Sequence, residues 1–302
     1  MPTVEVNDLH KSYGDRTVVD GVSFQVHEGE IFGILGPNGA GKTTAVEHIS
    51  GLRKPDRGSV RVLGLDPIRD HRAVTEVLGT QLQESELQAK LTVREALHLY
   101  AAFYSRPADS DALAERLGLG GMLDTRFAKL SGGQKQRLFI ALALVGSPRI
   151  VVLDELTTGL DPRGRRDTWE LIEDIRDSGV TVLLVTHFME EAQRLCDRVA
   201  VFDSGRIRAL GSPAELIGRS SSAVVVSFRP SGPLDLASLE TLPGVVSART
   251  AHEQVVVEGN DESVHAVLGL LGARGLVAER LRIVEATLDD AYLDLTEHRS
   301  AT

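Results

Sequence analysis

Residues 36–43 have the sequence Gly-Pro-Asn-Gly-Ala-Gly-Lys-Thr and directly follow a short apolar run, which is the context of a phosphate-binding loop. Glycines in such a loop allow successive backbone N–H groups to point at one anion where a helix begins. The ammonium of Lys42 adds a positive charge beside the outer phosphates of a nucleotide, and the hydroxyl of Thr43 can bind Mg²⁺. The predicted nucleotide-binding residues are Gly36, Pro37, Asn38, Gly39, Ala40, Gly41, Lys42, Thr43 and Thr44.

Two adjacent carboxylates, Asp154 and Glu155, follow the apolar run at residues 150–153. An aspartate at the carboxyl end of a buried strand can hold Mg²⁺ through water, and the glutamate after it can orient and deprotonate an attacking water molecule. Acidic residues are common at strand ends, so the pair alone indicates little. Together with the phosphate-binding loop the pair predicts a hydrolase, with Asp154 and Thr43 as metal ligands and Glu155 and Lys42 as catalytic residues.

A third motif, Leu130-Ser131-Gly132-Gly133-Gln134, precedes a helical pattern at residues 135–145. Its serine and glycines place free N–H groups at the start of a helix, which makes it a second anion site suited to a terminal phosphate. With this pentapeptide the sequence resembles the ATP-binding cassette (ABC) family, whose signature motif it matches. The resemblance extends from about residue 4 to residue 215. The signature residues that it implies in ATP binding are Ser131, Gly132, Gly133 and Gln134.

The resemblance also implies roles for single residues elsewhere in the chain. Tyr13 matches the aromatic residue that stacks on adenine, and Asp161 lies in the loop that crosses between two protomers. Gln83 matches the glutamine that touches Mg²⁺ and reports to a transporter partner, although Gln81 is a nearby rival for that position. His187 matches the histidine that contacts the terminal phosphate and the catalytic glutamate. Without the resemblance, Tyr13 would be a packing residue and His187 a hydrogen-bonded residue at a strand end.

One position departs from the usual family sequence, because Leu156 follows Glu155 where related sequences have proline. Leucine leaves free the φ angle that proline would fix, so the turn after Glu155 could be looser. Both carboxylates are present. We therefore expect hydrolysis to persist, at a rate that this turn could alter.

A narrower resemblance, to the ATP-binding subunits of daunorubicin-resistance-type (ABC-2) drug exporters, depends on residues 186–192, 196–199, 203–207 and 286–292. It implies an ATPase that works as a homodimer, binds ATP and Mg²⁺, and powers a separate integral membrane permease that exports drugs or other small hydrophobic compounds. It also implies a peripheral position on the inner face of the cell membrane, with membrane contact only through the permease. The alternatives are an importer subunit, which shares every catalytic motif, and a soluble cassette protein that acts on DNA or the ribosome.

Short apolar runs alternate with helical patterns along the first two thirds of the chain. Four runs are apolar throughout, which is typical of strands buried on both faces of a mainly parallel sheet. They comprise residues 31–35, 150–153, 180–185 and 199–202. Apolar positions three and four apart predict helices at residues 42–50, 134–145, 163–177 and 190–195. This alternation predicts an α/β fold, and the resemblance specifies a P-loop NTPase cassette with an antiparallel N-terminal β part.

The stretch at about residues 84–129 differs from the rest of the cassette. It contains one short strand-like run, at residues 91–93, and a strong helical pattern at residues 93–104. We expect a helical insertion there, which together with the following helix forms a helical subdomain at about residues 84–145.

The composition changes again after Gly218, where the chain becomes polar. Residues 221–302 hold six arginines, no lysine and twelve acidic residues, a net charge of −6. Strand-like runs at residues 224–228 and 254–257 and a helical pattern at residues 261–271 predict a small α+β unit. The predicted organisation is therefore an ATP-binding domain at residues 1–219 and an acidic accessory or dimerisation domain at residues 220–302.

The charge balance and the cysteine content restrict the partners and the compartment. The chain has 33 Lys and Arg against 43 Asp and Glu, a net charge of −10 without a basic block, which argues against nucleic-acid binding. Its one cysteine, Cys196, cannot form an intramolecular disulfide, and the N-terminus is too acidic for a signal peptide. The longest apolar runs are far shorter than the ~18 residues that span a bilayer. These features predict a cytoplasmic protein with no membrane span of its own.

Overall fold

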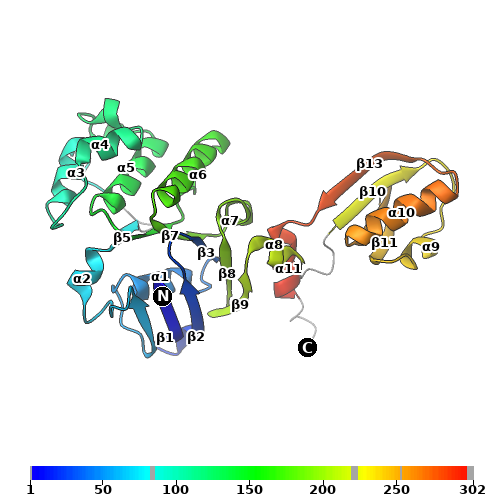
Figure 1. Ribbon diagram of the computed structural model, residues 1–302, viewed down its shortest axis with the longest axis horizontal. Helices are drawn as coiled ribbons and strands as arrows, with labels where there is room; N and C mark the ends of the chain where they lie inside the picture. The colour runs from blue at the N-terminus through cyan, green and yellow to red at the C-terminus, as the bar shows by residue number, and fades with distance from the viewer. Residues whose placement is uncertain (1, 82–85, 219–223, 252–253, 298–302) are drawn as a thin grey trace. The chain divides into compact units, whose positions relative to one another are not determined.

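The computed structural model describes residues 2–81, 86–218, 224–251 and 254–297, the side chains of residues 294–297 excepted. It divides into two compact units, Met1–Gly211 and Ser212–Thr302. Each unit has its own hydrophobic core and is described by itself (Figure 1). The domain boundary predicted at residues 219–220 lies outside the described residues, and the division between the two units falls after Gly211.

The centre of the first unit is a six-stranded sheet with the strand order β5-β6-β7-β3-β8-β9. Its strands are β3 (Ile31–Leu35), β5 (Leu78–Gln81), β6 (Ile150–Asp154), β7 (Thr181–Thr186), β8 (Arg198–Asp203) and β9 (Arg206–Gly211). All pair in parallel except β9, which is antiparallel to β8. Every residue of β3, β6 and β7 is buried, as uninterrupted apolar runs predict. The predicted α/β cassette fold is confirmed.

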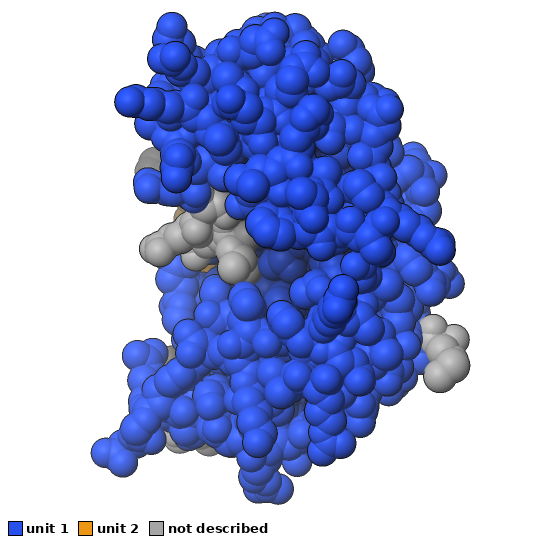
Figure 2. Space-filling model, turned by 90° about the vertical axis from the view of Figure 1, so that its left-hand side faces the viewer, with its two compact units in different colours: residues 1–211 blue, residues 212–302 orange. Residues whose placement is uncertain are grey.

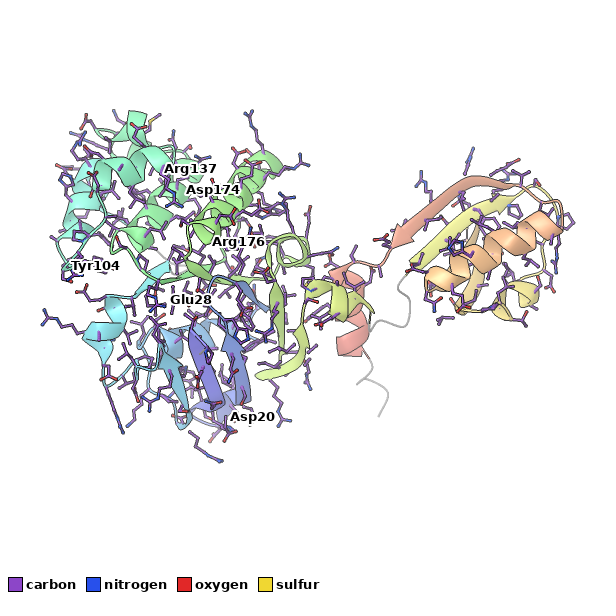
Figure 3. The ribbon with its side chains drawn as sticks, in the orientation of Figure 1. Asp20, Glu28, Tyr104, Arg137, Asp174 and Arg176 are labelled. Atoms are coloured by element: carbon purple, nitrogen blue, oxygen red, sulfur yellow. The ribbon has the colours of Figure 1, made fainter. Side chains whose placement is uncertain are left out.

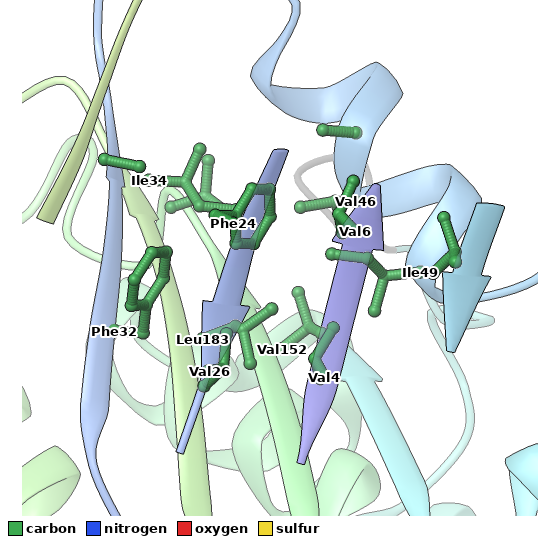
Figure 4. Packing of buried hydrophobic residues seen from close by; sticks show 14 of the residues in the cluster. Val4, Val6, Phe24, Val26, Phe32, Ile34, Val46, Ile49, Val152 and Leu183 are labelled. Carbon is green, nitrogen blue, oxygen red and sulfur yellow. The ribbon is translucent and has the colours of Figure 1, made fainter. Parts of the chain in front are cut away.

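A three-stranded antiparallel sheet with the order β2-β1-β4 shares a hydrophobic core with the central sheet. Its strands are β1 (Val4–Tyr13), β2 (Arg16–Val26) and β4 (Arg57–Val62). Figure 4 shows this core, in which the rings of Phe24 and Phe32 are stacked with their centroids 5.3 Å apart. This sheet is the expected antiparallel N-terminal part. Tyr13, at the end of β1, lines the same cavity as Asn38 and Gly39 of the loop that follows β3.

Seven α-helices are described in this unit: α1 (Lys42–Ile49), α2 (His71–Thr75), α3 (Val93–Ala101), α4 (Ser110–Arg116), α5 (Gly132–Leu144), α6 (Pro162–Asp177) and α7 (Met189–Leu195). The four helices predicted in the α/β part are present, with ends that differ by one or two residues. None of the helices in the described part of the chain combines the length and the apolar character needed to cross a membrane.

The helical insertion is present as α3, α4 and two 3₁₀ turns, Gly120–Met122 and Phe127–Lys129. Two details of its prediction are wrong. The strand-like run at residues 91–93 forms no strand, because Thr92 instead caps α3 in a capping box with Glu95. The helix expected to reach residue 104 ends at Ala101, since the N–H groups of Phe103 and Tyr104 bond three residues back, to the carbonyls of Tyr100 and Ala101.

Arginine contacts fasten the helical part to α6, the helix that follows the catalytic strand β6. Arg137 of α5 donates to the carbonyl of Leu117 at 3.2 Å and lies 3.9 Å from Asp167 of α6. Arg116 of α4 donates to the carbonyl of Asp174, also on α6, at 2.9 Å. Figure 3 labels Arg137 and Asp174 on the two neighbouring helices. Figure 2 shows the first unit from the side of α2 and α3.

The second unit contains a four-stranded antiparallel sheet with the order β11-β12-β10-β13. Its elements are α8 (Pro213–Gly218), β10 (Val224–Pro230), α9 (Ala237–Glu240), β11 (Val245–Ala251), β12 (Gln254–Gly259), α10 (Asp261–Ala273), β13 (Ala278–Glu285) and α11 (Leu288–Glu297). The predicted α+β arrangement is confirmed, but the prediction missed β11 and β13. Strand β13 has no buried residue and carries charges among its apolar side chains, so no apolar pattern marks it.

Candidate active site

The loop between β3 and α1 turns through three glycines with positive φ angles. These are 152° at Gly36, 81° at Gly39 and 101° at Gly41. A Cβ atom at Gly36 would lie 2.2 Å from the carbonyl oxygen of Phe202, and one at Gly41 would lie 2.6 Å from that of Val18. Glycine is therefore required at both positions. Within the described part of the chain no side chain caps the start of α1, so its first N–H groups remain available to an anion.

The Lys42 side chain lies inside this loop and is only 4% exposed. Its ammonium donates to the carbonyl oxygens of Gly36 at 2.7 Å and Pro37 at 3.1 Å. Burial lowers the pKa of Lys42, and the nearby carboxylates of Glu155 and Asp154 act in the opposite direction. The loop thus holds a buried cation beside the predicted catalytic carboxylate of Glu155 and the predicted metal ligand Asp154.

Asp154 ends strand β6 with its carboxylate in the interior. The residue is 1% exposed, and within the described part of the chain neither carboxylate oxygen has a hydrogen-bond partner. Burial and, to a smaller extent, the charge of Glu155 raise the pKa of Asp154 to about 6, although Lys42 opposes the rise. Two buried oxygens without partners suit a hard divalent cation such as Mg²⁺. The described residues hold no cluster of three or more His, Cys, Asp or Glu, so such a cation needs further oxygen ligands from hydroxyls, water or phosphate.

Glu155 and His187 meet at the ends of the neighbouring strands β6 and β7. The Nδ1 atom of His187 lies 3.2 Å from the Oε1 atom of Glu155. Glu155 has a left-handed backbone conformation, with φ 51°, and its N–H donates to the carbonyl of Val185 at 2.9 Å. Its side chain is 7% exposed, whereas that of His187 is 31% exposed. The structure therefore brings together two predicted catalytic residues, with the histidine on the solvent side.

A cavity of about 520 Å³ opens beside the phosphate-binding loop. Predicted residues that line it are Tyr13, Asn38, Gly39, Gly41, Lys42, Thr43, Thr44 and Glu155. Lining residues that the sequence analysis missed are Arg16, Val18, Glu47 and Arg53. Sequence signals were available for Arg16, Val18 and Glu47 but not for Arg53. Arg16 and Val18 are alternate residues of β2, so their side chains lie on the same face of the sheet. Glu47 follows Thr44 by about one helical turn, so these two side chains lie on the same face of α1.

Two other loop residues line a smaller cavity of about 310 Å³ on the same loop. There Pro37 is exposed and Ala40 is 3% exposed. Their backbone atoms belong to the loop that wraps the anion site, because the N–H of Ala40 donates to the carbonyl of Pro37 at 3.2 Å.

The signature residues form the start of α5 and do not line the 520 Å³ cavity in the described structure. Ser131 and Gln134 make a capping box: the N–H of Gln134 donates to the Ser131 hydroxyl at 3.3 Å, and the N–H of Ser131 donates to Gln134 Oε1 at 2.9 Å. Among the described residues, a Cβ atom at Gly132 or Gly133 would meet nothing within 4 Å. Neither glycine is thus required by packing within this chain.

The last predicted residue that the structure describes, Asp161, lies at the start of a helix. Asp161 caps α6, because its Oδ1 atom accepts from the N–H of Gly164 at 2.7 Å. Gln83 lies outside the described residues. Its rival Gln81 ends β5, where its Oε1 atom accepts from the N–H of Asp154 at 3.2 Å. Gln81 therefore orients the backbone of the predicted metal ligand.

A glycine-rich loop before a helix, a buried lysine and carboxylates at the ends of parallel strands define a P-loop NTPase. The family model described as ABC transporter matches residues 19–158. The Nod factor export ATP-binding protein I of Paraburkholderia xenovorans is 38% identical over 97% of this chain and 96% of its own length. The corresponding protein of Ralstonia nicotianae is 41% identical over 98% and 94%. The chain belongs to the ABC transporter family and is an ATP-binding subunit that hydrolyses ATP.

Further relatives agree with this assignment. The daunorubicin resistance ATP-binding protein DrrA3 of Streptomyces coeruleorubidus is 36% identical over 97% of this chain and 95% of its own length. Among solved structures, the ATP-binding subunit of an ABC transporter is 29% identical with a TM-score of 0.65, covering 72% of this chain and 92% of that chain. A dimeric ATP-binding cassette bound to ADP and Pi is 25% identical with a TM-score of 0.61, covering 69% and 98%.

Proposed function

We propose that this chain is the ATPase subunit of an exporter and powers a separate integral membrane permease that moves drugs or other small hydrophobic compounds outward. Two observations support export over import: the full-length relatives are named for Nod factor export and daunorubicin resistance, and both share the second unit of this chain as well as the cassette. The acidic composition argues against a soluble cassette protein that acts on DNA or the ribosome. The chain would be cytoplasmic and would reach the membrane only through the permease.

The contact between Glu155 and His187 beside the buried Lys42 carries the proposed mechanism. The N–H groups of the glycine-rich loop and the Lys42 ammonium bind the β- and γ-phosphates, while the Tyr13 ring receives the adenine. The Glu155 carboxylate accepts a proton from the attacking water, and His187 holds that carboxylate in place and contacts the γ-phosphate. Thr43, Asp154 and Gln83 would hold Mg²⁺, which supplies positive charge to the phosphates.

We assign the signature to the partner's nucleotide in a homodimer. Ser131, Gly132 and Gly133 lie at the start of α5 and away from the nucleotide cavity of their own chain, yet N–H groups at a helix start favour an anion. Open space around both glycines leaves room for a phosphate to approach the backbone. Asp161 lies at the start of α6 and belongs to the loop that crosses between protomers.

The proposed domains are an ATP-binding domain at residues 1–219 and an accessory or dimerisation domain at residues 220–302. None of the proposed catalytic residues lies in the second domain, and its acidic charge is unfavourable for phosphate. Its strand β13 exposes Leu281, Ile283 and Val284, which are apolar side chains suited to contact with another protein surface.

Purification from membranes tests the proposal. The tagged chain is expressed in cells that also carry the genes adjacent to its own gene, and the membranes are solubilised. The integral membrane protein that co-purifies is identified and is then reconstituted with the chain in vesicles. We expect outward movement of a hydrophobic compound that depends on ATP and is lost in Glu155→Gln. Co-purification of DNA or ribosomes in place of a membrane protein, or movement of the compound only inward, would contradict export.

A further inference from the structure

The nucleotide cavity carries an arginine with no assigned role at the end where Tyr13 lies. Arg53 belongs to the loop that follows α1, and both Arg53 and Tyr13 line the 520 Å³ cavity. The guanidinium carbon of Arg53 lies 5.3 Å from the centroid of the Tyr13 ring. This distance is within the range of a cation–π contact.

The guanidinium is tethered to the helix that starts at the phosphate-binding loop. The Nε atom of Arg53 donates to the Oε2 atom of Glu47 on α1, and the backbone N–H of Arg53 donates to the carbonyl of Glu47 at 3.2 Å. The hydrogen bond and the charge of Glu47 raise the pKa of Arg53. The planar cation therefore has a fixed orientation relative to α1.

The loop that carries Arg53 is also fastened to the strand that carries Tyr13. The Oδ1 atom of Asp56 accepts from the Lys11 ammonium at 2.7 Å, and its Oδ2 atom accepts from the N–H of Ser12 at 2.7 Å. The Lys11 ammonium also donates to the carbonyl of Lys54 at 3.3 Å. These bonds join Lys54 and Asp56, which both follow Arg53 in the loop, to the two residues before Tyr13, so the ring and the guanidinium are held close together in advance of any ligand.

We propose that Arg53 is a base-contacting residue that holds the nucleotide base against Tyr13, with Glu47 fixing the guanidinium. A planar guanidinium stacks on aromatic rings and bases, whereas an ammonium offers only a point charge. A base that stacks on the cavity side of Tyr13 takes over the contact that Arg53 makes with the ring. The side chains of Arg53 and of its partner Glu47 are 45% and 22% exposed, so the hydrogen-bonded pair can shift outward together to admit a base without breaking a packed core. The inference depends on the proposed role of Tyr13.

Binding measurements that separate base from phosphate test the inference. ADP and inorganic pyrophosphate are titrated by calorimetry into the full-length protein, since neither is hydrolysed and only ADP has a base. We expect Arg53→Ala to raise the Kd for ADP by roughly threefold to tenfold, the range of a partly exposed cation–π contact. The Kd for pyrophosphate should change by less than about twofold. Lys54→Ala, which removes the same charge from the adjacent exposed position, should leave both constants within about twofold.

Three results would overturn the inference. An equal loss of affinity for ADP and pyrophosphate would place Arg53 on the phosphates, and an unchanged or lower Kd for ADP would exclude a base contact. The same loss of ADP affinity in Lys54→Ala would mean that the effect comes from the positive charge of the loop in general and not from the contact of Arg53 with the base. Tyr13→Ala separates this inference from the proposed function: if it weakens ADP binding and Arg53→Ala does not, the base site stands and the role of Arg53 is wrong. If the unmodified protein binds neither ligand, the proposed nucleotide site itself fails.

Discussion

The imidazole of His187 lies 3.2 Å from the carboxylate of Glu155, although the two residues are far apart in the sequence. They meet because β6 and β7 are adjacent and parallel, so that their carboxyl ends reach the same edge of the sheet. The histidine is the more exposed of the two side chains, and the glutamate is almost buried. A ligand that approaches this edge from solvent therefore contacts His187 before it reaches the more buried Glu155.

Glu155→Gln should abolish hydrolysis while preserving nucleotide binding. The amide keeps the size of the side chain but cannot accept a proton from water, and loss of a general base costs about 10²- to 10⁴-fold in rate. We expect the ADP affinity to change by less than about twofold and a nucleotide-loaded dimer to accumulate with ATP and Mg²⁺ in size-exclusion chromatography. Glu190→Gln, at an exposed carboxylate on α7, is the matched control and should retain turnover. A Glu155→Gln variant with normal turnover would remove Glu155 from the mechanism.

Mixing two inactive variants tests whether the signature acts on the partner's nucleotide. Lys42→Ala removes the cation of the phosphate-binding loop, and Ser131→Arg blocks the start of α5 without changing the nucleotide cavity of its own chain. Each variant alone should be inactive, and Ser131→Arg should still bind ADP. In a heterodimer one composite site regains an intact loop and an intact signature, so mixing should restore part of the ATPase activity. Absence of activity in verified heterodimers would argue against the assignment in trans.

Asp154→Asn should stabilise the metal-free protein at neutral pH. The folded protein holds the Asp154 proton up to about pH 6, whereas the unfolded chain releases it near 3.8, so this group lowers stability as the pH rises between these values. At 1.36 kcal/mol per unit the upper limit is about 3 kcal/mol. In EDTA, the free energy of unfolding of Asp154→Asn relative to the unmodified protein should increase from pH 4 to pH 7. Urea titrations followed by the fluorescence of Trp169 measure this, and a difference independent of pH would contradict the raised pKa.

The catalytic part of this site was predictable because its conformation is nearly dictated by residue type. Uninterrupted apolar runs allow few arrangements other than buried parallel strands. The positive φ angles at Gly36 and Gly41 restrict the backbone conformation of the loop that joins β3 to α1. Asp154 and Glu155 then lie at a strand end by direct continuation of β6. Their chemistry follows from local sequence alone.

Contacts that join distant segments were not predictable in the same way. Arg53 meets Tyr13 only because Asp56 fastens one loop to β1, and the sequence has no pattern that pairs these residues. Strand β13 was missed for a related reason, since an edge strand exposed on both faces needs no regular alternation of apolar residues. Helix α5 begins two residues earlier than expected because its Ser131 cap, a local hydrogen bond, decides where the helix starts.

Trp169→Phe should destabilise the first unit because it removes the hydrogen-bond donor of a buried carboxyl group. The indole N–H of Trp169 on α6 donates to the Oε1 atom of Glu191 on α7 at 3.0 Å, and within the described residues the other oxygen of this fully buried glutamate has no partner. Removing the donor takes away the hydrogen bond of a buried carboxyl group, which costs about 2 kcal/mol. Urea unfolding followed by circular dichroism measures the loss. Glu191→Met in the Trp169→Phe background should recover most of it, whereas additive losses would mean that the two side chains do not interact.

Removing the second unit tests whether it forms an interface or only supports the cassette, and the place of the cut matters. Helix α8 packs against α11, and Leu216 of α8 is buried, so a chain that ends at Arg219 would keep α8 without its neighbour. A chain that ends at Gly211 removes both helices together with the acidic sheet.

We expect the shorter chain, ending at Gly211, to remain folded and to bind ADP with an unchanged Kd, because Tyr13, the phosphate-binding loop and Glu155 all lie in the first unit. Its association with a second copy, measured by analytical ultracentrifugation with ATP in the Glu155→Gln background, should be weaker than that of the full chain. The chain ending at Arg219 should aggregate more than the one ending at Gly211, since it exposes Leu216. Aggregation of both chains, or loss of ADP binding in both, would mean that the second unit stabilises the cassette. Unchanged association and transport would exclude an interface role, because the exposed apolar side chains of β13 would then contribute to neither.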